Sequence, residues 1–153
     1  MPNALLPVPH FEQSRDGACL PACLRMVLAY WGHHYSETEM AKILGTKDFG
    51  TPISNVERIR QYGYQVEMGM ITETQLKAHL VAGSPVIARV WTAMLDYWPA
   101  EVSSHVVVVV GFDEAYVYLN DPALTKAPQP TGWNSFLAAW AEFDETAIML
   151  RPV

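Results

Sequence analysis

Apolar residues in the first half of the chain recur with the spacing of helices. Within Cys19–Trp31, six apolar residues follow an i, i+3/i+4, i+7 series, which predicts an amphipathic helix. Pro21 falls in its first turn, where a missing N–H costs nothing, and Gly32 follows its last apolar residue. Capping residues and apolar spacing predict three further helices, from Ser36 to about Leu44, from Ile53 to about Tyr62 and from Thr72 to about Gly83.

In the second half of the chain the pattern changes to that of strands. The stretch Val106–Val110 is continuously apolar, which predicts a strand buried on both faces. Three further β-rich stretches and one short helix are predicted, the strands over Pro85–Trp91, Tyr116–Leu119 and Thr146–Leu150 and the helix over Trp133–Trp140. N-terminal helices followed by an antiparallel sheet define an α+β fold in which the two layers pack against each other.

The composition narrows the class of protein. With 153 residues, half of them hydrophobic, the chain is long enough for one well-packed domain, which we expect to span residues 1–153. The formal net charge is −6 and the ten Lys and Arg residues form no basic stripe, so we expect no nucleic-acid partner. No apolar run approaches the roughly 20 residues of a membrane helix, and the first residues lack the pattern of a secretory signal. We therefore expect a cytoplasmic protein that does not enter the membrane.

Cys19 begins the first predicted helix. Unpaired backbone N–H groups and the positive end of the helix dipole favour a thiolate at such a position, and the thiolate is the nucleophilic form. Cysteine is also among the most often buried residues, so position alone does not separate a nucleophile from a structural thiol. We interpret Cys23, one turn later, as a buried structural thiol, because the two cysteines do not form the Cys-x-x-Cys pattern of a redox pair.

A base for this thiol is available in the second half of the chain. His105 opens an apolar strand, and the next strand runs into Asn120 and Asp121. If the two strands pair so that Val110 faces Tyr116, His105 lies directly opposite Asp121, with Cβ atoms roughly 5 Å apart. A carboxylate there fixes the tautomer of the imidazole and leaves its other nitrogen for a thiol. Asn120 could also orient the imidazole, but strand alternation points it to the opposite face.

These residues carry a resemblance to a known family. Gln13 lies six residues before Cys19, His105 leads a strand that ends in Gly111, and Asp121 is followed by Pro122. The order Gln, Cys, His, Asp and the surrounding residues resemble the bacteriocin-processing cysteine peptidases, papain-like enzymes that remove leader peptides after a Gly-Gly pair. The resemblance spans nearly the whole chain, and four motif positions in order are far more specific than any one of them.

The resemblance implies a papain-like cysteine peptidase fold and a thiol hydrolase. In this fold Cys19 would attack the substrate, His105 would act as its base, Asp121 would orient His105 and Gln13 would donate to the oxyanion. No histidine of the chain stands at metal-ligand spacing from a cysteine, so we expect neither a metal nor a cofactor.

Two departures from the family pattern affect the substrate. Many members have Asp-Cys-Gly where this chain has Ala18-Cys19-Leu20, and Leu20 could narrow the cleft beside the thiol. The membrane and ATPase domains of transporter-linked members have no counterpart here, so we expect a stand-alone enzyme. The substrate is expected to be a peptide or protein, and a Gly-Gly leader is one candidate.

Three other hypotheses fit parts of the sequence. The domain could bind peptides without catalysis, or use the same triad for acyl transfer, or act as a thiol redox protein. The filled motif positions favour an enzyme over a silent domain, but sequence does not separate transfer from hydrolysis. The segment from Trp91 to His105 contains Tyr97 and Trp98, which either fill the core or form a wall of the substrate site.

Overall fold

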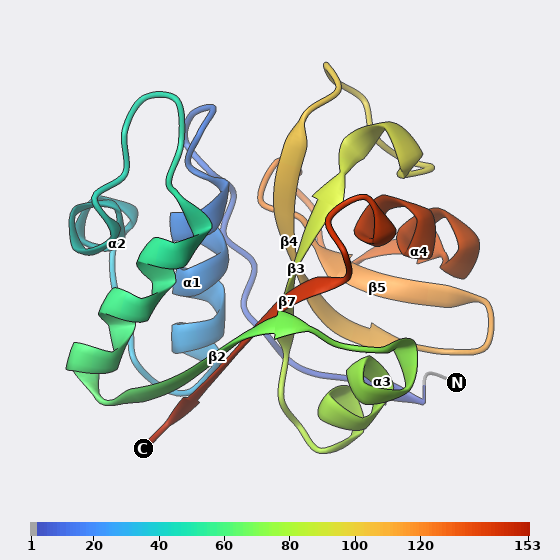
Figure 1. The fold of residues 1–153 in the computed structure, drawn as a ribbon, viewed down its shortest axis with the longest axis horizontal. Coiled ribbons are helices and arrows are strands. Elements are labelled where there is room, and N and C mark those ends of the chain that lie inside the picture. The colour runs from blue at the N-terminus through green and yellow to red at the C-terminus, as the bar shows by residue number, and fades with distance from the viewer. Residues whose placement is uncertain (1–2) are drawn as a thin grey trace.

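The computed structural model describes residues 3–153 and places a seven-stranded sheet between two groups of helices (Figure 1). The helices are α1 (Cys19–Tyr30), α2 (Glu37–Leu44), α3 (Glu73–Val81) and α4 (Trp133–Ala141), with the 3-10 helices η1 (Ile53–Tyr62) and η2 (Thr92–Met94). The strands are β1 (Ala4–Leu5), β2 (Tyr64–Met70), β3 (Val86–Trp91), β4 (Ser104–Phe112), β5 (Tyr116–Asn120), β6 (Gln129–Gly132) and β7 (Thr146–Pro152). The expected α+β class is confirmed.

The sheet has the strand order β2-β7-β3-β4-β5-β6, and β1 pairs with the end of β4. The helices α1, α2 and η1 pack on one face, and α3 and α4 cover the other (Figure 1). The central strand β4 contributes Val106, Val108 and Val110 to the first core and Val107 and Val109 to the second. This division explains why the strand is continuously apolar, as predicted for burial on both faces.

The capping signals in the sequence set the limits of two helices. Ser36 and Glu39 form a reciprocal capping box at the start of α2, and the helix ends at Gly45 in the left-handed region with φ 67°. Thr72 and Gln75 form the same capping box before α3. Local hydrogen bonds therefore account for both helix starts without help from the rest of the fold.

The two edge strands of the sheet were not predicted from the sequence. The first half of the chain contains β2, an edge strand in which only Tyr64 and Val66 are buried. The opposite edge is formed by β6, which includes Pro130. An edge strand needs only one neighbour and tolerates proline, so its sequence signal is weaker than that of a central strand.

The predicted pairing of β4 with β5 is wrong by two to three residues. Val108 lies opposite Asn120, and a bulge follows before Gly111 pairs with Tyr118. The turn is tighter than expected because the Asp113 carboxylate accepts hydrogen bonds from the backbone N–H groups of residues 115 and 116, at 2.9 and 2.7 Å. Continuing this register places Asp121 opposite Val107, whose side chain shares a face with His105. Asp121 therefore approaches His105 diagonally rather than from directly across.

Candidate active site

Cys19 is the first residue of α1 and is partly exposed. The segment before it packs against the loop at residues 48–50, where Gly17 adopts φ +82° and a Cβ would lie 2.7 Å from the carbonyl oxygen of Asp48. Only glycine fits this close approach, and the approach fixes the entry of the chain into α1. The first N–H groups of the helix have no partner within the helix, so they are available to the sulfur.

The surroundings of Cys19 stabilise its thiolate. Burial by itself raises the pKa of the thiol. A hydrogen bond with His105 and the positive charge of its ring, together with the backbone N–H groups of Leu20 and Val106, outweigh burial and lower the pKa below its ordinary value. The thiol and the imidazole therefore favour an ion pair.

His105 lies near the start of β4 and is buried. Its Nε2 is 2.7 Å from Oδ1 of Asp121, which leaves Nδ1 for the Cys19 sulfur. Burial alone would lower the pKa of His105, but the hydrogen bonds to Asp121 and Cys19 and their negative charges raise it to about 9. The ring is therefore positively charged near neutral pH.

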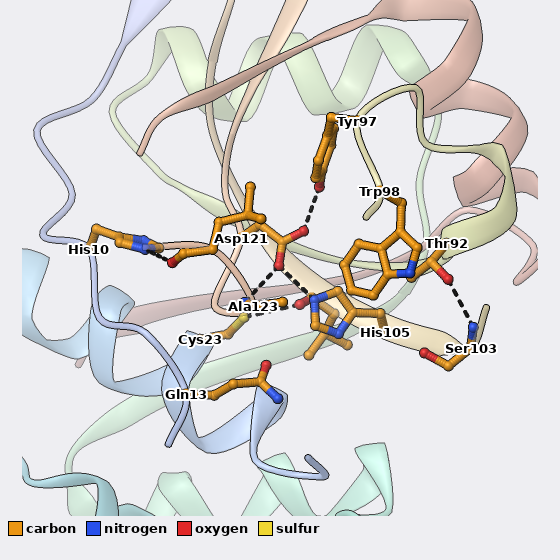
Figure 2. Close-up of polar contacts among 12 residues, drawn as sticks. His10, Gln13, Cys23, Thr92, Tyr97, Trp98, Ser103, His105, Asp121 and Ala123 are labelled. Carbon is orange, nitrogen blue, oxygen red and sulfur yellow. Dashed lines mark hydrogen bonds and ion pairs between the residues drawn. The ribbon is translucent and has the colours of Figure 1, made fainter. Parts of the chain in front are cut away.

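Asp121 is fully buried, and each group that donates a hydrogen bond to it stabilises the charged carboxylate. Oδ1 also accepts from the backbone N–H of Ala123 at 2.9 Å, and Oδ2 accepts from the hydroxyl of Tyr97 at 2.5 Å. Figure 2 shows Asp121 between Tyr97 and His105. Burial would raise the pKa of Asp121, but the bonds to His105, Tyr97 and Ala123 lower it.

The segment leading into β4 contributes two aromatic side chains to this site. The ring of Trp98 lies beside His105, with 4.9 Å between ring centroids and 54° between planes (Figure 2). Thr92 exchanges hydrogen bonds with Ser103, which close the base of the segment. The sequence singled out Tyr97 and Trp98 as core or wall residues, but gave no sign that Tyr97 binds Asp121. That contact joins residues 24 apart in the chain and depends on the tertiary structure.

Gln13 is held beside the same group of residues by the backbone. Its N–H donates to the carbonyl oxygen of Pro122 at 2.7 Å, which ties the segment before α1 to the turn that carries Asp121. The side-chain Nε2 donates to the carbonyl oxygen of Arg15 at 2.9 Å. Among residues 3–153 no partner is found for the second N–H of this amide or for its buried Oε1. Gln13 thus has hydrogen-bonding capacity left for a ligand.

Cys19, His105 and Gln13 line one cavity of about 770 Å³. One wall is formed by residues 13–17 and 49–51, and the other by residues 98–105. A peptide that enters this cavity has the sulfur and the imidazole within reach, and Trp98 forms part of the wall.

Cys23 and Asn120, the other residues considered from the sequence, contact backbone carbonyl groups and do not line the cavity. Cys23 is fully buried, its Sγ lies 3.5 Å from the carbonyl oxygen of Val106, and burial raises the pKa of this thiol well above its ordinary value. The Asn120 amide donates to the carbonyl oxygen of Val8 at 3.0 Å and so holds the N-terminal segment. Within the part of the chain that the structure describes, no group of three or more His, Cys, Asp or Glu residues could hold a metal ion.

Replacing Tyr97 with Phe should lower the free energy of unfolding at pH 7 by about 1–2 kcal/mol, because the buried carboxylate of Asp121 loses a donor. The bond to Tyr97 helps to lower the pKa of Asp121. A lowered pKa stabilises the fold above the unfolded pKa of about 3.9, and this stabilisation disappears as the pH falls through the folded pKa. The difference between the two proteins in urea unfolding should therefore shrink below about pH 4.

The matched control for this substitution is Tyr116→Phe. Tyr116 is 47% exposed and its hydroxyl has no hydrogen-bond partner within residues 3–153. Its replacement should change the free energy of unfolding by no more than about 0.5 kcal/mol. Equal losses in the two variants would show that the Tyr97–Asp121 bond contributes nothing specific.

The fold is that of the papain-like peptidases, in which a helix that begins with cysteine packs on an antiparallel sheet. The chain belongs to the Peptidase_C39 like family, whose family model matches residues 5–148. The expected resemblance is thereby confirmed. A search of curated protein sequences finds no match.

Many solved structures share this fold, and three of them are compared with this chain. A putative C39-like peptidase from Bacillus anthracis has a TM-score of 0.80 at 17% identity, with 98% of each chain covered. The peptidase domain of Streptococcus ComA, a bifunctional ABC transporter of a quorum-sensing pathway, has a TM-score of 0.77 at 21% identity, with 94% of this chain and 98% of that chain covered. A double glycine motif protease from an AMS/PCAT transporter, solved with its leader peptide, has a TM-score of 0.68 at 24% identity, with 99% of this chain and 96% of that chain covered.

At these identities the likeness to the three structures is one of fold. No helix among residues 3–153 is both long enough and apolar enough to cross a membrane.

Proposed function

We propose that this chain is a cysteine peptidase whose nucleophile is Cys19, with His105 as base and proton carrier, Asp121 as the residue that orients His105, and Gln13 as an oxyanion donor. The observation that carries the proposal is the contact of His105 Nε2 with Asp121 Oδ1 at a cavity of about 770 Å³ that Cys19 and His105 line together. A structural histidine needs no thiolate partner and no cleft.

The residues divide the reaction into two steps. The Cys19 thiolate attacks the peptide carbonyl carbon, and the carbonyl electrons move to oxygen. The backbone N–H of Cys19 and the amide of Gln13 stabilise this oxyanion, each such donor being worth about 3 kcal/mol. His105 then gives its Nδ1 proton to the leaving nitrogen, the C–N bond breaks, and a thioester remains on Cys19.

Water completes the turnover. His105, now neutral, accepts a proton as water attacks the thioester, and the thiolate leaves as the acid is released. Asp121 keeps Nε2 protonated throughout, so that the nitrogen facing Cys19 is the one that exchanges protons. Trp98 lies against the ring and keeps water away from one side of it.

The proposed substrate is a peptide, and the proposed catalytic domain spans residues 1–153. Both helical groups pack on the one sheet, and residues from the two halves of the chain meet at the cavity, which supports a single catalytic domain. The related transporter protease was solved with its leader peptide. We extend that peptide substrate class to this chain, and a Gly-Gly leader is the first candidate to test.

A pool of synthetic peptides, with and without Gly-Gly pairs, tests this proposal by mass spectrometry. The intact protein should cleave a subset of the pool, and pre-treatment with iodoacetamide should stop the cleavage. Cleavage in H₂¹⁸O should place the heavy oxygen in the new carboxylate, whereas products joined to an added amine would indicate acyl transfer. Cleavage that persists after complete alkylation of Cys19 would rule out the proposed nucleophile.

A further inference from the structure

A second, smaller pocket adjoins the Cys19–His105 pair. Its volume is about 190 Å³, and both residues form part of its lining. The rest of the lining includes Leu20, the loop at residues 51–53 and Arg89. Leu20, which the sequence suggested could narrow the cleft beside the thiol, lines this pocket. Its size suits one side chain of a bound peptide, whereas the cavity of about 770 Å³ holds a longer segment.

Arg89 is the residue of this pocket that carries a permanent charge. It lies on β3, is half-buried, and its guanidinium carbon is 4.1 Å from the centre of the Phe143 ring. Phe143 supports the side chain by a cation–π contact but accepts no in-plane hydrogen bond. Among residues 3–153 no carboxylate lies within ion-pair distance of this guanidinium, although the chain has a net charge of −6. Its planar set of donors thus has no carboxylate partner among residues 3–153, and Arg89 lines the same pocket as Cys19.

The two cavities differ in charge. No Asp or Glu lines the smaller pocket, so Arg89 adds one positive charge there to the Cys19–His105 ion pair, which both cavities share. The larger cavity is lined by Asp16 and Glu101 as well as Arg15, and Arg15 pairs with Asp48 at 3.3 Å. An anionic group of a substrate is therefore attracted to the smaller pocket and not to the larger cavity.

We propose that Arg89 selects substrates that place a carboxylate side chain, Asp or Glu, in this smaller pocket, within two residues of the scissile bond. The guanidinium binds the carboxylate through paired N–H donors, and Leu20 contacts the methylene groups of the same side chain. This inference rests on the proposed cysteine peptidase function. It adds a substrate class to that function, because a glycine at the same position leaves Arg89 without a partner.

Electrophilic peptides test the selection before any natural substrate is identified. The probes are aza-peptide Michael acceptors that carry glycine residues on both sides of the reactive carbon. In each probe one glycine, at one of the two positions nearest that carbon on either side, is replaced by Glu or by Gln. Each rate of Cys19 labelling is divided by the same protein's rate with iodoacetamide, so that differences in thiolate reactivity cancel. At one position the Glu probe should label the wild-type protein about tenfold faster than the Gln probe.

Variants assign this preference to one residue. Arg89→Gln should bring the Glu-to-Gln ratio at that position to about one, and Arg89→Lys should retain part of it. The matched control is Arg151→Gln, which removes an exposed arginine outside both cavities and should keep the wild-type ratio. Thermal unfolding of each variant confirms that the fold is present.

Two results would overturn the inference in different ways. If Gln probes label the wild-type protein as fast as Glu probes at all four positions while iodoacetamide labels Cys19 rapidly at pH 6, the peptidase proposal stands and the role of Arg89 is wrong. If iodoacetamide also labels Cys19 only as fast as an ordinary thiol, the proposed function fails, and the substrate preference fails with it.

Discussion

Alkylation of Cys19 by iodoacetamide should remain fast at pH 6 in the wild-type protein and slow at least tenfold when His105 is replaced by Ala. His105 supplies the hydrogen bond and positive charge that lower the pKa of Cys19, whereas burial raises it. Without the imidazole the thiol should behave at best as an ordinary one, which at a pKa near 8.5 is only about 0.3% ionised at pH 6.

The rate of Cys19 alkylation measured as a function of pH is a second test of the ion pair. Between the lowered pKa of Cys19 and the His105 pKa of about 9, the wild-type pair exists as thiolate and imidazolium. In His105→Ala the rate should instead rise steeply toward pH 10, where the thiol ionises, so the two profiles converge. Asp121→Asn should give a smaller shift in the same direction, because the imidazolium loses its carboxylate but stays in place.

The sequence allows alkylation of Cys19 to be distinguished from that of Cys23, and it offers a control variant. Trypsin releases Cys19 and Cys23 in one peptide, Asp16–Arg25, and fragmentation before Pro21 separates the two sites of labelling. His34→Ala removes an exposed histidine and should leave the profile unchanged. A wild-type profile with one midpoint near 8.5 that His105→Ala does not move would mean that no ion pair forms.

Replacing Cys19 with Ala should abolish peptide cleavage, with a loss of at least about 10³-fold, and leave the fold intact. Loss of the nucleophile in a catalytic triad removes nearly all the rate that the triad provides. Cys19 is partly exposed at the first residue of α1, so its truncation should change the free energy of unfolding by less than about 1 kcal/mol. Cleavage of the peptide pool and urea unfolding measure the two effects.

Cys23→Ala is the matched comparison, because it removes the same atom one turn further along the helix. Cys23 is fully buried in the core between α1 and the sheet, so its truncation should cost about 1 kcal/mol of stability. Cleavage and Cys19 labelling should persist in this variant. If Cys23→Ala stops cleavage while Cys19→Ala only destabilises the protein, the nucleophile has been assigned to the wrong cysteine.

Much of the fold could be predicted because local rules decide it. The apolar spacing of residues 19–31 and the capping boxes at Ser36 and Thr72 act within one or two turns of helix, and the helices begin where these signals predict. The continuous apolar run of β4 predicted a strand buried on both faces for a similarly local reason. The edge strand β2 was missed because five of its seven residues are exposed and it pairs only with β7.

The sequence by itself determined which residue types were available for chemistry and their order along the chain. The order of Gln13, Cys19, His105 and Asp121 carried the resemblance, and the family model matches residues 5–148 without any use of coordinates. Strand alternation ranked Asn120 behind Asp121 as the orienting residue, and in the structure the Asn120 amide donates to the carbonyl oxygen of Val8.

Only the tertiary structure decided how these residues meet. The bulge between Val109 and Gly111 shifts the register, so Asp121 reaches His105 diagonally, and no local signal reveals such a shift. The contact of Tyr97 with Asp121 joins residues 24 apart in the chain, and the pocket that Arg89 and Cys19 line together involves residues 70 apart. Contacts at such separations depend on the packing of the whole sheet and its helices, which is why the bond of Tyr97 to Asp121 and the pocket lined by Arg89 could be recognised only in the folded chain.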